Sequence, residues 1–164
     1  MEMTDKPQED RDAIVEMHAD TVWRIALSRT RRQDAAEEVF QEVFLRLFQK
    51  ERQFNEEEHR KAWLIRTTLI CCRSYLTASL KNTTLSLEEV GDTIALPEEK
   101  SVLFEALLRL PAKYRIPLQL HYIEGLGSDE GAKAMGIRPG TFRVRLSRGR
   151  NLLREILKGE GIYV

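Results

Sequence analysis

The chain has few of the residue types that form catalytic sites and metal sites in proteins. Its 164 residues include only two cysteines and three histidines. Cys71 and Cys72 are neighbours, so on a helix they point in different directions and form neither a disulfide framework nor a metal-binding set. His18, His59 and His121 lie far apart with no metal-ligand spacing among them. Because a glycine-rich phosphate loop and a nucleophile motif are also missing, we expect no enzyme activity, no cofactor and no metal.

Long apolar runs are missing too. No stretch approaches the roughly 20 apolar residues that cross a bilayer. The first ten residues, MEMTDKPQED, are polar and acidic rather than a signal peptide. Two unpaired thiols fit a reducing compartment. We therefore expect a cytoplasmic protein without membrane insertion.

Neither sign of charge is in excess overall, since the formal net charge is zero, but the charges are segregated along the chain. Residues 59–81 hold five Lys or Arg and no acid, and residues 106–164 hold eleven Lys or Arg against five acids. Between these blocks, residues 82–105 hold six acids and one lysine. Two basic blocks, each preceded by an acidic one, indicate two contact surfaces for a polyanion and acidic surfaces for protein contacts.

The most specific pattern lies between residues 126 and 157. Ser128 and Asp129 are capping residue types and predict the start of a short helix. Gly136 can end that helix in the left-handed conformation, and Pro139 suits the first turn of the next helix. An apolar stripe then follows the helical period through Phe142, Leu146, Gly149, Leu153 and Ile156. This pattern predicts a helix-turn-helix.

The other faces of that second helix are cationic. Residues 138–150 contain five arginines and no acid: Arg138, Arg143, Arg145, Arg148 and Arg150. The first turns after the tight turn are where a recognition helix meets the major groove, and the arginine fork matches guanine O6/N7 and phosphate. A solvated basic helix at the end of a bundle is the plainer interpretation, but the position of the arginines favours DNA binding.

Helical periodicity predicts three helices in the first half, over residues 12–29, from Asp34 onward, and over about 59–80. Asp34 is expected to be the N-cap of the second helix, with Glu37 in capping-box position. On the third helix, Trp63 is expected in the core rather than stacked on an unpaired base. The basic residues of this helix predict one cationic strip: Arg60, Lys61, Arg66, Arg73 and Lys81.

Residues 82–97 break the helical period and predict a linker. After it, Pro111 is expected to end or kink a helix, and Pro117 predicts a bend or a late start in the next helix. The sequence therefore predicts an all-α protein with two small helical domains, residues 10–81 and 98–160, the second carrying the helix-turn-helix.

With these segments in order, the chain resembles the extracytoplasmic-function (ECF) group of sigma factors. These are small members of the sigma-70 family, which gives bacterial RNA polymerase its promoter choice. Residues 34–48, DAAEEVFQEVFLRLF, resemble the family's core-polymerase-binding helix. Residues 61–76, KAWLIRTTLICCRSYL, resemble the helix that reads the promoter −10 element, and residues 107–153 resemble the domain that reads the −35 element.

The resemblance implies three sets of contact residues. Polymerase binding is implied for Asp34, Glu38, Gln41, Glu42 and Leu45. Contact with the −10 region is implied for Lys61, Trp63, Arg66, Ile70, Arg73 and Ser74. Contact with the −35 region is implied for Arg138, Thr141, Arg143, Val144, Arg145 and Arg148. Ile70 and Ser74 stand where many relatives carry an asparagine and an aspartate, which implies an altered −10 preference or weak promoter melting.

The implied function is to bind core polymerase, direct it to a two-part promoter and assist strand opening by capturing flipped bases around residues 53–63. The implied partners are core RNA polymerase, double-stranded and melted promoter DNA, and an anti-sigma factor. Two alternatives stay open from the residues alone. One is a helix-turn-helix regulator that acts without polymerase, and the other is a sigma-like protein that does not initiate transcription.

Overall fold

The computed structural model describes residues 8–49, 54–82 and 101–162. Within these ranges the backbone forms seven α-helices and one π-helical turn, which confirms the all-α prediction. The elements are α1 (Gln8–Thr30), α2 (Gln33–Gln49), α3 (Glu57–Asn82), α4 (Ser101–Leu108), α5 (Ala112–Leu118), the π-helical turn η3 (Gln119–Ile123), α6 (Ser128–Met135) and α7 (Pro139–Gly159). Most of the predicted linker, residues 83–97, lies outside the described residues.

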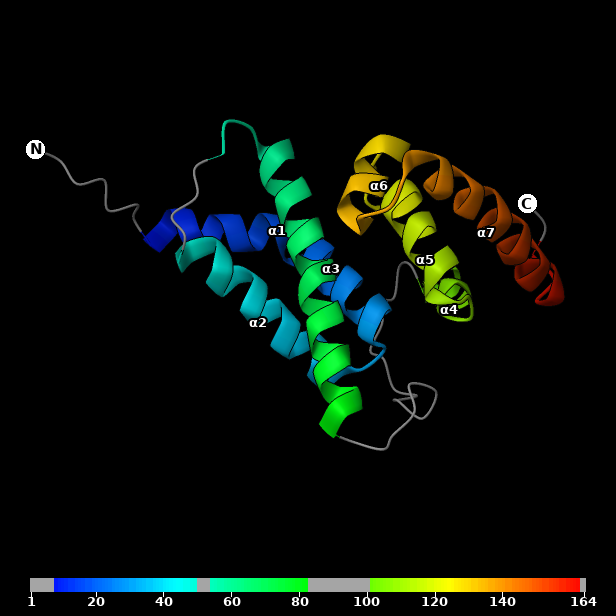
Figure 1. The fold of residues 1–164 in the computed structure, drawn as a ribbon, viewed down its shortest axis with the longest axis horizontal. Helices are drawn as coiled ribbons and strands as arrows, with labels where there is room; N and C mark the ends of the chain where they lie inside the picture. Colours follow the sequence, from blue (N-terminus) through cyan, green and yellow to red (C-terminus); the bar gives the residue numbers. More distant parts are fainter. Residues whose placement is uncertain (1–7, 50–53, 83–100, 163–164) are drawn as a thin grey trace, which may run out of the picture.

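Helices α1, α2 and α3 pack on one another as a three-helix bundle (Figure 1). Its centre is formed by apolar side chains that recur at helical spacing, among them the fully buried Val22, Ala26, Val43, Leu64 and Cys72. The helical stripes read from the sequence therefore do face a common core. Both cysteines are free and buried.

The predicted start of α2 is wrong by one residue. The helix begins at Gln33, so Asp34 lies within its first turn instead of capping it. The Asp34 carboxylate accepts from the backbone N–H of Ala35 at 2.9 Å and from Arg32 Nε at 3.0 Å. Glu37 accepts from the Gln33 side chain at 3.5 Å, so the predicted capping box is wrong as well. The ion pair with Arg32 engages the carboxylate that a cap would need.

Helices α6 and α7 form the predicted helix-turn-helix. Gly136 follows α6 with φ = 69°, the left-handed conformation that glycine adopts without steric cost. Pro139 is the first residue of α7, where its missing N–H costs no helical hydrogen bond. The N-cap of α6 is Gly127 and no side chain caps the helix, so the expected capping role of Ser128 is wrong.

Pro117 disturbs its helix after the proline rather than before it. The prediction of a late start is wrong because α5 begins at Ala112, directly after Pro111, and includes Pro117. The following residues, 119–123, form the π-helical turn η3. A proline removes one backbone donor from its helix, and the change to π-helical hydrogen bonding begins two residues after Pro117.

The two halves of the chain pack against each other, α3 on α6 and α1 on α5 (Figure 1). Ile25 of α1 and Ile65 of α3 are fully buried in one apolar cluster with residues of the C-terminal helices, such as Ile116 and Leu126. The described helices therefore form a closed arrangement, in which α3 has the C-terminal helices on one side and α2 on another.

Candidate functional site

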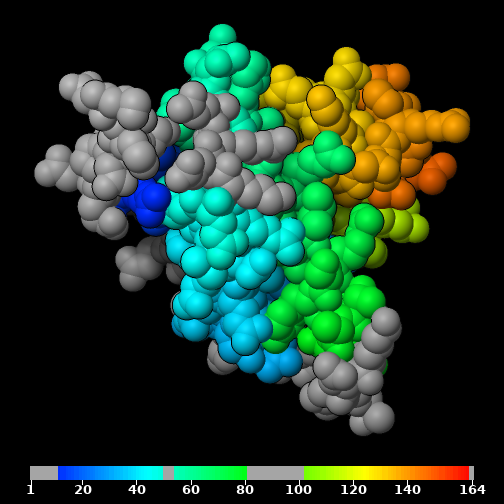
Figure 2. Space-filling model, turned by 60° about the vertical axis from the view of Figure 1, so that its left-hand side comes forward, coloured from blue at the N-terminus to red at the C-terminus, as the bar shows by residue number. Residues whose placement is uncertain are grey.

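The residues expected to bind polymerase lie on the exposed face of α2. Glu38, Gln41, Glu42 and Leu45 line a groove of about 440 Å³ between α2 and α3. Leu45 is 53% exposed although it is a large apolar residue. Figure 2 shows α2, in cyan, and α3, in green, side by side on this face. An exposed leucine among carboxylates suits a protein segment that offers both apolar and basic side chains.

Asp34 lies away from this groove, exposed at the start of α2 and paired with Arg32 at 2.8 Å. Glu42 is paired with Arg46 one turn further along the helix, at 2.9 Å. Arg46 also lines the groove and offsets the charge of Glu42, so the acidic character of the groove comes mainly from Glu38. The structure thus brings together four of the five residues implied for polymerase binding.

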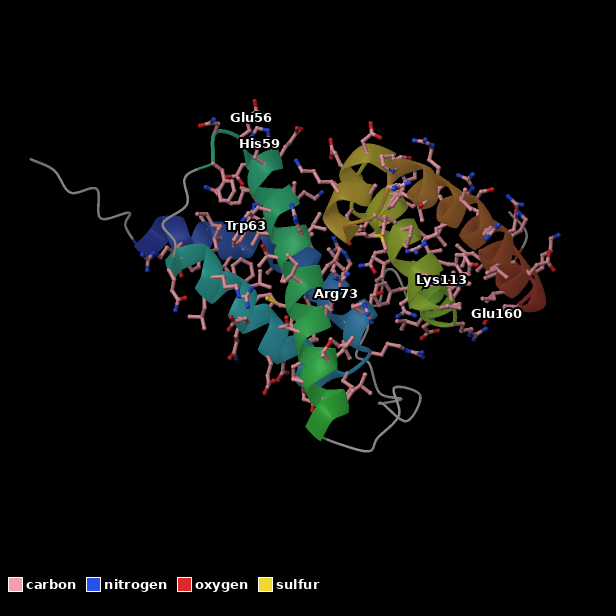
Figure 3. The ribbon with its side chains drawn as sticks, viewed as in Figure 1. Glu56, His59, Trp63, Arg73, Lys113 and Glu160 are labelled. Carbon is pink, nitrogen blue, oxygen red and sulfur yellow. The ribbon has the colours of Figure 1, made fainter. Side chains whose placement is uncertain are left out.

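The residues implied for the −10 contact do not lie together. Arg66, Ile70 and Arg73 share one exposed face of α3, turned toward the C-terminal helices, where all three line a common pocket. Figure 3 shows Arg73 on α3 and Lys113 on the facing helix α5. This face contains the two free basic side chains that a contact with phosphates would use.

The other three −10 residues face elsewhere. Lys61 Nζ donates to the backbone carbonyl oxygen of Glu124 at 2.6 Å, across to the C-terminal helices. Trp63 is half-buried, with its ring 5.9 Å from that of Phe54, on the side of α3 away from α6 (Figure 3). Ser74 lines the groove between α2 and α3. Trp63 is thus part of the packing, as expected.

The predicted single cationic strip on α3 is wrong. Arg60 is buried, forms an ion pair with Glu57 and lies over the Phe54 ring at 5.6 Å from its centroid. Glu57 in turn is paired with His18 at 2.9 Å. This hydrogen bond, together with Arg60, holds the pKa of the Glu57 carboxyl below its usual range. The described basic residues of α3 therefore do not form one surface. Arg60 contacts Glu57, Lys61 contacts the backbone of Glu124, and Arg66 and Arg73 line the pocket, because successive positions of a helix point in different directions.

The residues implied for the −35 contact lie on the first turns of α7 and just before it. Five of the six are exposed: Arg138, Thr141, Arg143, Val144 and Arg148. Arg145 is half-buried because it faces the pocket between α3 and α5. On the opposite side of α7, Phe142 is fully buried and holds the helix against α6. This geometry presents a cationic helix face to solvent at a fixed angle to the protein core.

A close contact between α6 and α7 sets that angle. A methyl group at Gly131 would lie 2.4 Å from Cζ of Phe142, which is far inside van der Waals contact. Only glycine allows Phe142 to pack over α6 at this distance. This role of Gly131 was not predicted, and its only signal in the sequence is a glycine in the middle of a short predicted helix.

The contact that joins the two halves was also missed. Arg24 Nη2 donates to Glu124 Oε1 at 2.7 Å, and Arg24 Nε donates to Oε2 at 3.1 Å. The Glu124 side chain is fully buried, and the hydrogen bond from Arg24 raises the pKa of the guanidinium. The available signal was that Glu124 is the only acid in residues 106–128. Its partner, 100 residues away, is not marked by any local pattern.

Within the described ranges, no group of three or more His, Cys, Asp or Glu side chains could hold a metal ion. None of the described helices is long and apolar enough to cross a membrane.

Two family models match the chain. Residues 14–81 match "Sigma-70 region 2", and residues 101–153 match "Sigma-70, region 4". The chain is 30% identical to the ECF RNA polymerase sigma factor SigW of Bacillus subtilis, an alignment that covers 91% of each chain. It is 29% identical to the ECF RNA polymerase sigma factor SigE of Mycolicibacterium smegmatis over 89% of this chain, but spans only 61% of that relative.

Solved structures share the fold. The sigma factor RpoE of Bartonella quintana, in complex with the anti-sigma factor NepR, superposes with a TM-score of 0.74 at 22% identity, covering 92% of this chain and 98% of that one. CnrH, in complex with the cytosolic domain of CnrY, superposes with a TM-score of 0.62 at 21% identity, covering 94% of this chain and 91% of that one. At these identities the likeness concerns the arrangement of helices.

Proposed function

This chain belongs to the extracytoplasmic-function sigma factors of the sigma-70 family, and on that basis we propose which of its surfaces binds polymerase and which bind promoter DNA. It is an RNA polymerase sigma factor that directs transcription initiation, and it is not an enzyme. The observation that supports this most strongly is that both sigma regions occur in one chain, in the family's order, with a relative matched over 91% of its length.

The groove between α2 and α3 is the proposed docking surface for core polymerase. Its support is the combination of an exposed Leu45 with the carboxylates of Glu38 and Glu42 at its rim. Such a surface complements a partner helix with apolar and basic side chains. Gln41 adds a hydrogen-bonding group to the same surface, and Asp34 would act at its edge.

The proposed promoter contacts fall on two helices. The −10 region would be contacted by three residues of α3: Arg66, Ile70 and Arg73. Ile70 would make an apolar contact where a polar side chain would form a hydrogen bond to a base. The exposed face of α7 would enter the major groove at the −35 region, with Arg143 and Arg148 on bases or phosphates. The domain limits proposed for these tasks are residues 10–81 and 98–160, joined by residues 82–97.

The proposed setting is the cytoplasm, where the protein would be held by an anti-sigma factor until it is needed. The support is that two structures sharing the fold are named as complexes with NepR, an anti-sigma factor, and with the cytosolic domain of CnrY. The exposed groove on α2 and the basic face of α7 are the surfaces that such a partner would cover.

The test is transcription in vitro by sigma-free bacterial core polymerase with the purified chain, on a library of promoter-length DNA with random −35 and −10 elements. We expect transcripts from a subset of templates that share two sequence elements at a fixed spacing. Binding of the chain to DNA without any transcript above the core-only control would contradict the roles proposed for these surfaces. The protein would then bind DNA without initiating transcription.

A further inference from the structure

A second cavity lies between the two halves of the molecule. It encloses about 530 Å³ and is lined by residues of α1, α3, α5, α6 and α7 and of the turn between α6 and α7. This volume falls in the range of roughly 300–1,000 Å³ that is typical of small-molecule pockets. Five of its lining side chains are cationic and none is acidic: Arg29, Arg66, Arg73, Lys113 and Arg145.

These cations lack counter-ions among the described residues. Arg29, Arg66, Arg73 and Arg145 form no ion pair or hydrogen bond with any residue that the structure describes. Lys113 Nζ lies over the Tyr114 ring, 5.0 Å from its centroid. Elsewhere between the halves, Arg24 is matched by the Glu124 carboxylate, and Lys61 donates to the backbone carbonyl of Glu124. The cavity therefore carries a positive potential that nothing described in the protein neutralises.

The protein behind the cavity adds to this potential. Arg115 is 3% exposed, and its Nε has no hydrogen-bond partner in the structure. Burial, together with the charges of Arg31 and Arg29, lowers the pKa of Arg115 to about 10, so it stays protonated at neutral pH. Burial also lowers the pKa of Arg29, and the charge of Arg73 acts in the same direction. A polyanion in the cavity would relieve this repulsion.

The remaining walls are apolar. Leu69, Ile116, Met135 and Ile137 line the cavity beside the cations. A simple anion such as sulfate would leave these side chains without a partner, whereas a flat, weakly polar group would cover them.

We propose that this interdomain cavity binds a nucleoside polyphosphate, with the phosphates on the arginines of α3 and α7 and the base against the aliphatic side chains of α3, α5 and α6. Arginine is suited to this role because its fork binds phosphate oxygens in pairs. The ligand bridges the two halves, so it stabilises the closed arrangement relative to any open one.

The consequence for transcription rests on the function proposed above, but the binding itself does not. Arg66, Ile70 and Arg73 are the proposed −10 residues that face the cavity, and Arg145 is the proposed −35 residue that faces it. A nucleotide on these side chains competes with promoter phosphates for the same donors. High nucleotide concentration is therefore expected to weaken promoter binding.

The experiment is isothermal titration of ATP into the purified full chain, without polymerase or DNA, at moderate salt. We expect one site per chain, with affinity reduced about tenfold by Arg66→Ala and by Arg145→Ala, since each loses a charge-assisted hydrogen bond. Arg66 is exposed and Arg145 only half-buried, and neither belongs to an apolar cluster, so neither change is expected to unfold the protein. Arg148→Ala is the matched control because it removes an exposed arginine of α7 outside the cavity.

Inorganic tripolyphosphate is the second probe. ATP binding that is clearly tighter than tripolyphosphate binding supports a contact between the base and the apolar wall. Equal affinity would overturn the assignment to a nucleoside. An equal loss in Arg148→Ala and Arg66→Ala would show diffuse charge attraction, and no measurable ATP binding would overturn the site altogether. None of these results depends on whether the chain initiates transcription.

Discussion

At the scale of single residues, Gly131 and Phe142 show why a glycine that looks unfavourable in sequence can be required in structure. Within a helix, glycine is less stable than alanine by about 1 kcal/mol, so helix propensity alone would favour alanine at position 131. The structure places the Phe142 ring directly against the Gly131 backbone. The favourable packing of a fully buried phenylalanine thus depends on the missing side chain.

Gly131→Ala is expected to lower the free energy of unfolding by roughly 1–2 kcal/mol, because the cost of overpacking exceeds the gain in helix propensity. Urea denaturation followed by circular dichroism measures the change. Gly140→Ala is the matched control, since Gly140 lies in the first turn of α7 with nothing within 4 Å of the added methyl. That control is expected to be neutral or stabilising, and a stabilising Gly131→Ala would contradict the role assigned to the contact.

At the scale of elements, the sequence was most informative where the pattern is local. The stop at Gly136, the start at Pro139 and the apolar stripe of α7 are all present as predicted, because each depends on residues within a few turns. The start of α2 and the capping role of Ser128 in α6 were wrong, because nearby ion pairs and turn geometry decide which residue caps a helix. The π-helical turn after Pro117 was not predicted, because helical periodicity does not specify where a helix changes its hydrogen-bond pattern.

Arg145→Ala tests the role proposed for α7. In holoenzyme bound to its selected promoter, this variant is expected to lose discrimination at the −35 element by about 1–3 kcal/mol and to reduce the salt slope of binding by about one. Fluorescence anisotropy over a series of KCl concentrations, on the promoter and on a scrambled −35 element, measures both quantities. Arg154→Ala, which removes an exposed arginine near the end of α7, is the control. An equal loss of affinity on both DNAs would show that Arg145 contacts only phosphate.

At the scale of the whole molecule, the sequence predicted two helical units but not how they pack. Ile25 and Ile65 belong to the first predicted unit, but the core in which they are buried is shared with the C-terminal helices, which helical periodicity does not indicate. For the same reason, the sequence did not show which of the implied −10 residues face the same side of α3. Lys61, Trp63 and Ser74 each meet a different neighbour, and those neighbours are set by tertiary contacts between distant segments.

Glu124→Gln tests whether the buried pair with Arg24 holds the halves together. The change leaves the partly buried Arg24 guanidinium without a counter-ion, at a cost of roughly 1–3 kcal/mol to the closed arrangement. We expect a larger radius of gyration in small-angle X-ray scattering. Glu155→Gln, at an exposed carboxylate on α7, is the matched control. A scattering curve identical to that of the original chain would show that the apolar contacts alone suffice.

The most direct test of the account is co-elution with sigma-free bacterial core RNA polymerase, because every proposed role follows from docking through the α2 groove. We expect the chain to co-elute at moderate salt and Leu45→Arg to lose this binding. Leu80→Arg is the control, since Leu80 is 52% exposed against 53% for Leu45 and lies outside the groove. If Leu45→Arg binds as well as the control, the docking surface is wrong, and if the original chain does not bind while DNA affinity remains, the central claim is contradicted.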